Sequence, residues 1–297
     1  MKPAPFEFES PATVQEVLDR LEEEPEAELM AGNQSLGIVM SNRLAAPDHI
    51  IDLNEVDELA FVEETDEAIE VGAMTCHRTI ERSDLLDRKL SMLSEAAAQI
   101  AGPSVRNRGT VGGSIGEADP AGNYPTALLA LDATITIRSV DETREVPVSD
   151  YFIAYMFTDL RENELIERVT IPTEPFPPER TGMTFEELKR TGQTWPTVSA
   201  AAVIRVDDPA AEEPQIEEAR LALANVDDVP LRVEDAEATV EGGPLSETAL
   251  STATDIVVEA SNPEGEMHAD EEYKEEAAGE YARIALETAF DRATQSQ

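Results

Sequence analysis

The apolar positions of the chain repeat at helical spacing in several places. Between residues 13 and 21 they recur every three or four residues, which predicts a short helix capped by Ser10 or Thr13. Similar patterns predict helices over residues 36–44, 76–101, 124–131, 248–259 and 273–294.

Short apolar or alternating runs predict strands between these helices. The run at residues 28–31 ends at Gly32, so residues 28–44 are expected to form strand, turn and helix. Residues 134–148 suit a hairpin, and residues 102–123, with six glycines, are predicted to be a loop-rich segment. The other predicted strands cover residues 49–53, 59–63, 68–74, 164–172, 183–189, 198–206 and 216–226.

A proline-rich stretch marks the predicted domain boundary. Residues 172–178 contain four prolines and suit a linker. Two domains are therefore expected, at residues 1–174 and 180–297, as is usual for a chain of 297 residues. The last three predicted strands could pair as an antiparallel sheet within the second domain.

The charge of the chain is strongly acidic. Asp and Glu total 63 against 22 Lys and Arg, which gives a formal net charge of −41. Nucleic acid is therefore not expected as a partner, because phosphate binding requires basic patches. The acidic residues are spread along the chain, as on a halophilic surface whose self-repulsion needs screening by salt. Disorder is the alternative explanation, but apolar periodic segments recur throughout the sequence.

The cysteine and histidine content argues against a metal centre. Cys76 alone cannot form an intrachain disulfide, a four-cysteine zinc site or an iron–sulfur cluster. His49, His77 and His268 lack the spacing of metal ligands, so no metal is assigned. No Ser-His-Asp or Cys-His arrangement is suggested, so no catalytic residue is assigned and the chemistry is expected to belong to a cofactor.

No targeting or membrane segment is apparent in the sequence. The first residues lack the basic start and apolar core of a signal peptide, and no apolar run approaches the length of a membrane span. The cytoplasm is the expected compartment.

Two glycine-containing segments are candidates for binding phosphate. The first lies between a predicted strand and helix, where backbone N–H groups can receive phosphate oxygens, although Gly-Asn could also make a simple turn. It consists of Ala31, Gly32, Asn33, Gln34, Ser35 and Leu36. The second places hydroxyls on either side of a Gly-Gly pair expected to expose successive amides, and its alternative is a tight hairpin or a bulge. It includes Thr110, Gly112, Gly113 and Ser114 and matches neither a Walker A loop nor a Rossmann fingerprint.

These segments and the residues that follow them carry a family resemblance. Residues 31–36, 101–114, 117–120 and 125–133 resemble the medium, FAD-binding subunit of molybdenum hydroxylases. That family includes the flavoprotein subunits of aerobic carbon monoxide dehydrogenase and xanthine dehydrogenase. The resemblance extends over nearly the whole chain and weakens after about residue 230. The sequence departs from the family at Asn33, where a second glycine is usual, at Ser114, where Asn is common, and at Asn123, where family members often carry Asp.

The resemblance implies an α+β fold. The first domain would be a two-lobed FAD-binding domain of the vanillyl-alcohol-oxidase/PCMH type, not a Rossmann fold. Its lobes would cover about residues 1–55 and 56–174, with the pyrophosphate between them. A small domain with a three-stranded antiparallel sheet and helices would follow.

The resemblance also implies further cofactor contacts. Asp119 and Asn123 are expected near the ribityl or ribose hydroxyls, and Ile166 is expected to contact the flavin or adenine unless it only packs in the core. Trp195, the only tryptophan, is expected over the isoalloxazine ring, or alternatively at the domain interface. Lys189 could attract a phosphate or carboxylate, or form a surface salt bridge.

The implied function is electron transfer within a molybdenum hydroxylase complex. A large molybdopterin-binding subunit would oxidise the substrate, and a small [2Fe-2S] subunit would pass electrons to FAD on this chain, which would deliver them to an acceptor. A dimer of heterotrimers is expected. The alternatives are a self-sufficient FAD reductase of the same fold group, for which no acid and base pair is evident, and a scaffold subunit that has lost FAD.

Overall fold

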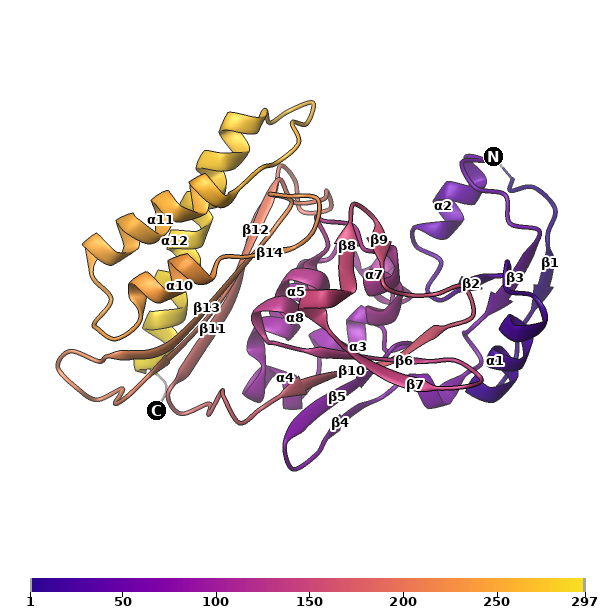
Figure 1. The fold of residues 1–297 in the computed structure, drawn as a ribbon, viewed down its shortest axis with the longest axis horizontal. Helices are drawn as coiled ribbons and strands as arrows, with labels where there is room; N and C mark the ends of the chain where they lie inside the picture. The colour runs from indigo at the N-terminus through magenta and orange to yellow at the C-terminus, as the bar shows by residue number, and fades with distance from the viewer. Residues whose placement is uncertain (1, 296–297) are drawn as a thin grey trace.

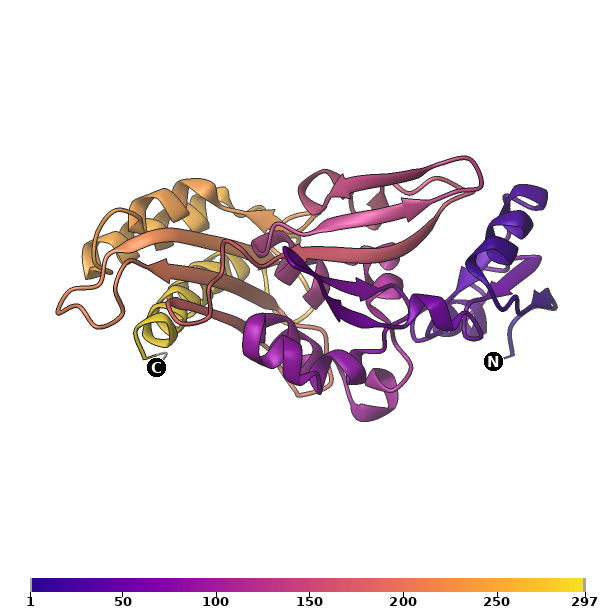
Figure 2. The ribbon, with the colours of Figure 1, turned by 90° about the horizontal axis from the view of Figure 1, so that it is seen from below.

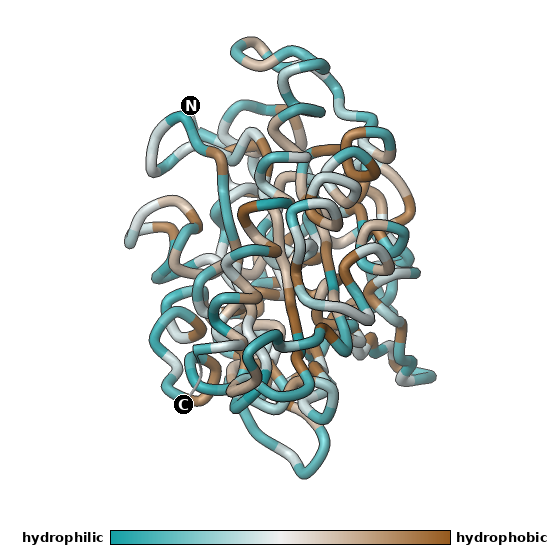
Figure 3. The backbone as a smooth tube through the Cα atoms, turned by 90° about the vertical axis from the view of Figure 1, so that its left-hand side faces the viewer, coloured by the Kyte–Doolittle hydropathy of each residue, from teal (hydrophilic) through white to brown (hydrophobic). Residues whose placement is uncertain are grey.

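The chain forms a mixed α+β structure that extends from a small N-terminal sheet to a helix-covered C-terminal sheet (Figure 1). This computed structural model describes residues 2–295. Residues 1, 296 and 297, at the outer ends of the two predicted domains, lie outside the described range. The N-terminal sheet and the C-terminal helices lie at opposite ends of the long axis (Figure 2). Hydrophobic segments gather along the central strands, whereas the peripheral loops are hydrophilic (Figure 3).

The N-terminal unit is a parallel three-stranded sheet covered by α1 (Val14–Glu23). The helix starts where Thr13 caps it, since the Thr13 hydroxyl accepts a hydrogen bond from the Glu16 N–H at 3.2 Å. Its apolar stripe is buried as the spacing predicts. The sheet has the strand order β1-β3-β2, and α2 connects β2 to β3 along the chain. The bounds are β1 Glu7–Glu9, β2 Glu28–Met30, β3 His49–Asp52 and α2 Leu36–Ser41. The charged three-residue β1 has no apolar alternation, which explains why the pattern missed it.

The central unit is an antiparallel five-stranded sheet with helices on one face. Its order is β4-β5-β10-β6-β7, with bounds β4 Val62–Glu64, β5 Ala68–Gly72, β10 Leu165–Pro172, β6 Thr134–Arg138 and β7 Thr143–Pro147. The predicted helical stretch of residues 76–101 is three short helices, α3 His77–Glu81, α4 Asp84–Lys89 and α5 Ser91–Gln99. Ser83 caps α4 by accepting from the Leu86 N–H, which separates α4 from α3.

The prediction that residues 102–123 form a loop-rich segment is wrong. They contain α6 (Pro103–Arg106) and α7 (Val111–Glu117), and α8 (Asn123–Ala130) begins within the same segment. Glycines disfavour helices intrinsically, but burial of Val111 and Ile115 holds α7 in place. Two short helices and a small hairpin were also not predicted; they are η1 Asp57–Leu59, α9 Val148–Tyr151, β8 Phe152–Ala154 and β9 Phe157–Thr158.

The C-terminal unit is an antiparallel sheet that is buried on both faces. The three predicted strands are present, and a two-residue strand extends the sheet to the order β11-β12-β13-β14. Along β12, Ala200 and Ala202 pack toward the C-terminal helices, whereas Ala201 and Val203 join the core around α5 and α8. The bounds are β11 Thr181–Leu188, β12 Val198–Val206, β13 Ile216–Ala224, β14 Leu231–Arg232, α10 Glu234–Val240, α11 Glu247–Ala260 and α12 Glu271–Gln295.

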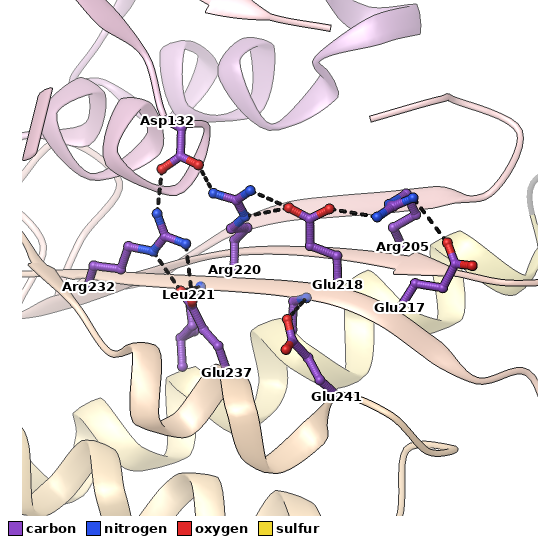
Figure 4. Close-up of polar contacts among 10 residues, drawn as sticks. Asp132, Arg205, Glu217, Glu218, Arg220, Leu221, Arg232, Glu237 and Glu241 are labelled. Carbon is purple, nitrogen blue, oxygen red and sulfur yellow. Dashed lines mark hydrogen bonds and ion pairs between the residues drawn. The ribbon is translucent and has the colours of Figure 1, made fainter. Parts of the chain in front are cut away.

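A chain of ion pairs joins the C-terminal sheet to the central unit (Figure 4). Asp132, just after α8, pairs with both Arg220 of β13 and Arg232 of β14. Arg220 in turn pairs with Glu218, which also binds Arg205 at 2.8 Å. Because Asp132 bridges two half-buried arginines from the other unit, it fixes how the sheet sits against α8.

No helix among residues 2–295 combines the length and the apolar character needed to cross a bilayer.

The contact between β11 and α12 yields a stability prediction. A Cβ on Gly182 would lie 2.0 Å from the Ala289 carbonyl oxygen and 2.4 Å from the Ala293 backbone nitrogen. Gly182→Ala should therefore lower the free energy of unfolding by about 3 kcal/mol, because two backbones would have to separate. Denaturant unfolding monitored by circular dichroism measures this loss.

The matched control is Gly243→Ala, because no atom lies within 4 Å of the position of its Cβ. An equal loss of stability in both variants would contradict the assigned packing of α12 on β11.

Candidate functional site

A cavity of about 640 Å³ lies between the two glycine-containing segments, a size typical of cofactor sites. Its walls come from the β2–α2 loop, α7, the start of α8, β10 and the segment after β11. The structure brings all but one of the predicted cofactor residues together here: Ala31, Gly32, Asn33, Gln34, Ser35, Leu36, Thr110, Gly112, Gly113, Ser114, Asn123, Ile166, Lys189 and Trp195.

The first segment connects β2 to α2 and touches the second segment directly. A Cβ on Gly32 would lie 2.2 Å from the Arg108 carbonyl oxygen and 2.6 Å from the Gly109 Cα, so only glycine allows this approach. Asn33 has a φ of 58°, the left-handed conformation that Asn tolerates. The substitution of Asn for the usual glycine is therefore compatible with the backbone.

The free backbone amides of the site lie in this first segment. Within residues 2–295, the N–H groups of Gly32, Asn33, Gln34 and Ser35 donate to no protein acceptor. Four consecutive donors at the edge of a cavity form a nest that suits an anion. This observation supports the phosphate-binding interpretation of the segment over that of a simple turn.

The second segment acts differently from its prediction. Thr110 is the N-cap of α7 and accepts from the Gly113 N–H at 3.1 Å, while the Gly112 N–H donates to the Ala73 carbonyl at 2.8 Å. The Gly-Gly pair therefore does not expose free amides, because the Ala73 carbonyl and the Thr110 hydroxyl accept from them. A Cβ on Gly112 would lie 2.6 Å from the Ala73 Cβ, so this glycine permits close packing of α7 on the end of β5.

Two predicted contacts lie on the buried walls. Asn123 is the first residue of α8 and is only 4% exposed, and Ile166 lies on β10 at 7% exposure. Ile166 both lines the cavity and belongs to the central core, so the two alternatives for this residue are compatible.

The segment after β11 closes the cavity with Lys189 and Trp195. The Lys189 Nζ pairs with Glu187 and donates to the Gln99 carbonyl oxygen, so Lys189 is held against α5. Trp195 is 56% exposed and lines the cavity, as the expected position over a ring requires. The exposed face of this indole ring is available to stack against a bound ring.

Asp119 is the exception among the predicted residues and does not line the cavity. Its Oδ1 accepts from the Ala121 N–H at 2.9 Å in the turn before α8. The Asp-Pro turn therefore uses the carboxylate locally, and burial raises the pKa of Asp119 against the opposing effect of that backbone hydrogen bond.

Three ionisable residues of the cavity, Glu28, His77 and Glu117, were not identified from the sequence. His77 is buried, and burial with help from the Arg106 charge lowers its pKa to about 4, so the imidazole is neutral near pH 7. Burial raises the pKa of Glu117, opposed by a hydrogen bond from Ser35. Glu117 lies within residues 117–120 of the family resemblance but was given no role there, and Glu28 and His77 stand in no recognisable motif, so only the fold assigns these residues to the cavity.

No group of three or more potential metal-ligating side chains occurs in the part of the chain that the structure describes.

The donor set fits a dinucleotide cofactor such as FAD. Four free amides and the Ser114 side chain could receive a diphosphate, while Leu36, Ile166 and Trp195 offer apolar surface for rings. The cavity thus combines an anion nest with apolar walls, which a cofactor with two planar ring systems and a diphosphate requires.

Known proteins place this architecture in one family. The FAD-binding domain of molybdopterin dehydrogenases matches residues 4–174, and the C-terminal domain of the carbon monoxide dehydrogenase flavoprotein matches residues 183–289. The medium chain of carbon monoxide dehydrogenase from Hydrogenophaga pseudoflava is 32% identical over 98% of this chain and 99% of its own. The medium subunit of nicotine 6-hydroxylase from Paenarthrobacter nicotinovorans is 31% identical over 96% and 98%, respectively.

A solved structure of carbon monoxide dehydrogenase from Hydrogenophaga pseudoflava includes a chain with the same fold. It superposes with a TM-score of 0.93 at 34% identity and covers 98% of this chain and 99% of that chain. The resemblance inferred from the two glycine-containing segments is thereby confirmed. The chain belongs to the family of FAD-binding medium subunits of molybdopterin dehydrogenases, and FAD is its cofactor.

Proposed function

We propose that this chain is the electron-transfer subunit of a molybdopterin-dependent hydroxylase or dehydrogenase. A large molybdopterin-binding subunit and a small [2Fe-2S] subunit would be its partners, in a dimer of heterotrimers. The observation that carries the proposal is the cavity with four free amides at one side and an exposed tryptophan at another. When bound there, FAD would supply the redox chemistry, and the chain would supply binding and orientation.

Different parts of the cavity wall would bind different parts of FAD. Gly32, Asn33, Gln34 and Ser35 would hold the diphosphate through their amides, helped by Ser114. Trp195 would cover the isoalloxazine ring, and Ile166 would contact an aromatic ring from the opposite wall.

The lining of the cavity bears on the two alternative functions, a self-sufficient reductase and a scaffold subunit without FAD. A self-sufficient reductase would need an acid and a base at the cavity, whose titratable lining residues within the described chain are Glu28, His77, Glu117 and Lys189. A neutral His77 is a poor proton donor near pH 7, and Lys189 is held in an ion pair with Glu187. A scaffold subunit without FAD would have no use for a preserved nest of free amides.

An apolar hairpin beside the cavity offers a surface for a partner. The tip between β8 and β9 exposes Ile153, Tyr155, Met156 and Phe157, each between 46% and 61%. Met156 also lines the cavity, so this surface adjoins the cofactor site. Clustered exposed apolar side chains mark protein interfaces, and a partner that delivers electrons must come close to the flavin.

The diphosphate position is tested by Gly113→Asp. The new side chain would start 2.9 Å from the Thr110 hydroxyl and 3.6 Å from the Ala31 Cβ, between the two segments. Crowding and repulsion of the diphosphate should weaken FAD binding by at least roughly 100-fold, about 2.7 kcal/mol. Absorption near 450 nm per chain measures the flavin content. Gly243→Asp adds the same charge in open space and should keep its FAD; normal flavin content in Gly113→Asp would refute the placement.

The ring position is tested at Trp195. Trp195→Ala should weaken FAD binding by about 1 kcal/mol, roughly fivefold, because stacking area is lost, and should increase the flavin fluorescence. Trp195→Phe keeps an aromatic ring and should stay close to the wild type. If Trp195→Ala matched the wild type in both affinity and fluorescence, another residue would have to cover the ring.

The acidic surface predicts dependence on salt, in keeping with a halophilic origin. The excess of 41 acidic groups repels itself over distances that salt shortens from about 10 Å at 0.1 M to about 3 Å at 1 M. Ion pairs such as Asp132–Arg220 are also screened, but acidic groups far outnumber their partners. The Tm should therefore rise between dilute buffer and 2 M KCl in calorimetry. An unchanged Tm would remove the halophilic interpretation.

A further inference from the structure

One buried carboxylate contacts residues of the cavity wall on the side away from the cavity. Glu187 lies near the end of β11, and its side chain is 1% exposed. It does not line the cavity, whereas two of its contacts, Asn123 and Lys189, do. Glu187 therefore touches the wall without reaching the space that a cofactor would occupy.

The contacts of Asn123 determine which way its amide group points. Its Nδ2 donates to the Ala96 carbonyl oxygen at 2.9 Å and to the Glu187 Oε1 at 2.7 Å. A backbone carbonyl and a carboxylate only accept, so the opposite orientation would set oxygen against oxygen at both contacts. Within residues 2–295 nothing donates to the Asn123 Oδ1, which leaves this oxygen as an acceptor for the cavity.

The contacts of Lys189 place a cation next to that acceptor. The Lys189 Nζ forms an ion pair with the Glu187 Oε2 at 2.5 Å and donates a hydrogen bond to the Gln99 carbonyl oxygen. An ammonium group has three N–H donors, so at least one donor remains for the cavity. Both oxygens of Glu187 are thus used, one for each wall residue.

Resting on the proposed FAD-binding function, we propose that Glu187 is a positioning residue for the cofactor. It fixes the Asn123 carbonyl oxygen as a hydrogen-bond acceptor and the Lys189 ammonium as a donor on one wall. The acceptor suits a hydroxyl or ring N–H of FAD, and the donor suits one of its oxygens. Asn123 and Glu187 belong to different units, so the C-terminal sheet takes part in cofactor binding through this carboxylate.

The burial of Glu187 makes its contacts with Lys189 and Asn123 energetically specific. Burial raises the pKa of Glu187, and Lys189 and Asn123 oppose that shift by binding its charged form. A buried carboxylate that lost one partner would be destabilised, because its remaining charge would be unpaired. The three side chains should therefore respond to substitution as one coupled group.

A negative charge introduced at Asn123 tests the coupling between Asn123 and Glu187. Asn123→Asp sets a second carboxylate against Glu187 and should weaken FAD binding at least roughly 30-fold. The double variant Asn123→Asp with Glu187→Gln restores a donor opposite the new carboxylate and should recover at least roughly fivefold of that loss. Titration of apoprotein with FAD in high salt, followed by flavin fluorescence, gives the dissociation constants. Asn262→Asp, an exposed position away from the cavity, is the charge-matched control.

A second measurement separates positioning from a structural role. Glu187→Gln alone keeps an acceptor for Asn123 and should leave FAD affinity within about threefold of the wild type. It removes the counter-charge of Lys189, so the midpoint potential of the bound flavin should rise, which loss of packing alone would not cause.

The outcomes distinguish the possibilities. A double variant that binds FAD no better than Asn123→Asp, or an Asn123→Asp that binds like Asn262→Asp, would overturn the positioning role. If Asn123→Asp does not fold, the potential of Glu187→Gln decides, and an unchanged potential overturns the proposal. Wild-type protein that binds no FAD would instead overturn the proposed function on which this inference rests.

Discussion

The structure depends on burial of the α5 and α8 pair between two sheets. All eight residues of α8 are buried, so the helix has no solvent face and must be covered on every side. The five-stranded sheet covers it on one side, and the inner face of the C-terminal sheet covers it on the other. Because both sheets pack on the same helices, their separation is set by the helix layer, and the cavity forms at the edge of that layer.

This arrangement explains why the cavity has walls from distant parts of the chain. The wall formed by the start of α8 is fixed by the helix layer. A second wall comes from β10, and the segment after β11 covers the cavity. The β2–α2 loop meets α7 only because Gly32 lets it touch the Arg108 carbonyl. A change that moved either sheet would therefore move the binding residues as well as the core.

The electrostatics of the site oppose those of the surface. A chain with a net charge of −41 should repel an anionic cofactor at long range. The free amides of residues 32–35 would present positive dipole ends to a bound diphosphate, where a low local dielectric strengthens them and salt screens them little. Burial also raises the pKa of Glu117, which reduces the tendency of this carboxyl to add negative charge beside Ser35. Local donors thus decide binding, while the surface charge governs solvation and the response to salt.

The sequence by itself determined most elements and the identity of the cofactor-binding segments. Periodicity located α1, α8, α11 and α12, because each buries a continuous apolar stripe or face. The glycine-containing segments predicted a phosphate site, since the approach of backbone to phosphate restricts the residue types, and their family resemblance predicted FAD. Only the tertiary structure decided which amides are free, because hydrogen bonds from Gly112 and Gly113 depend on Ala73 and on the Thr110 cap. Likewise the neutral state of His77 and the proposed role of Glu187 arise from burial among residues far apart in the chain, and a local pattern carries no record of such contacts.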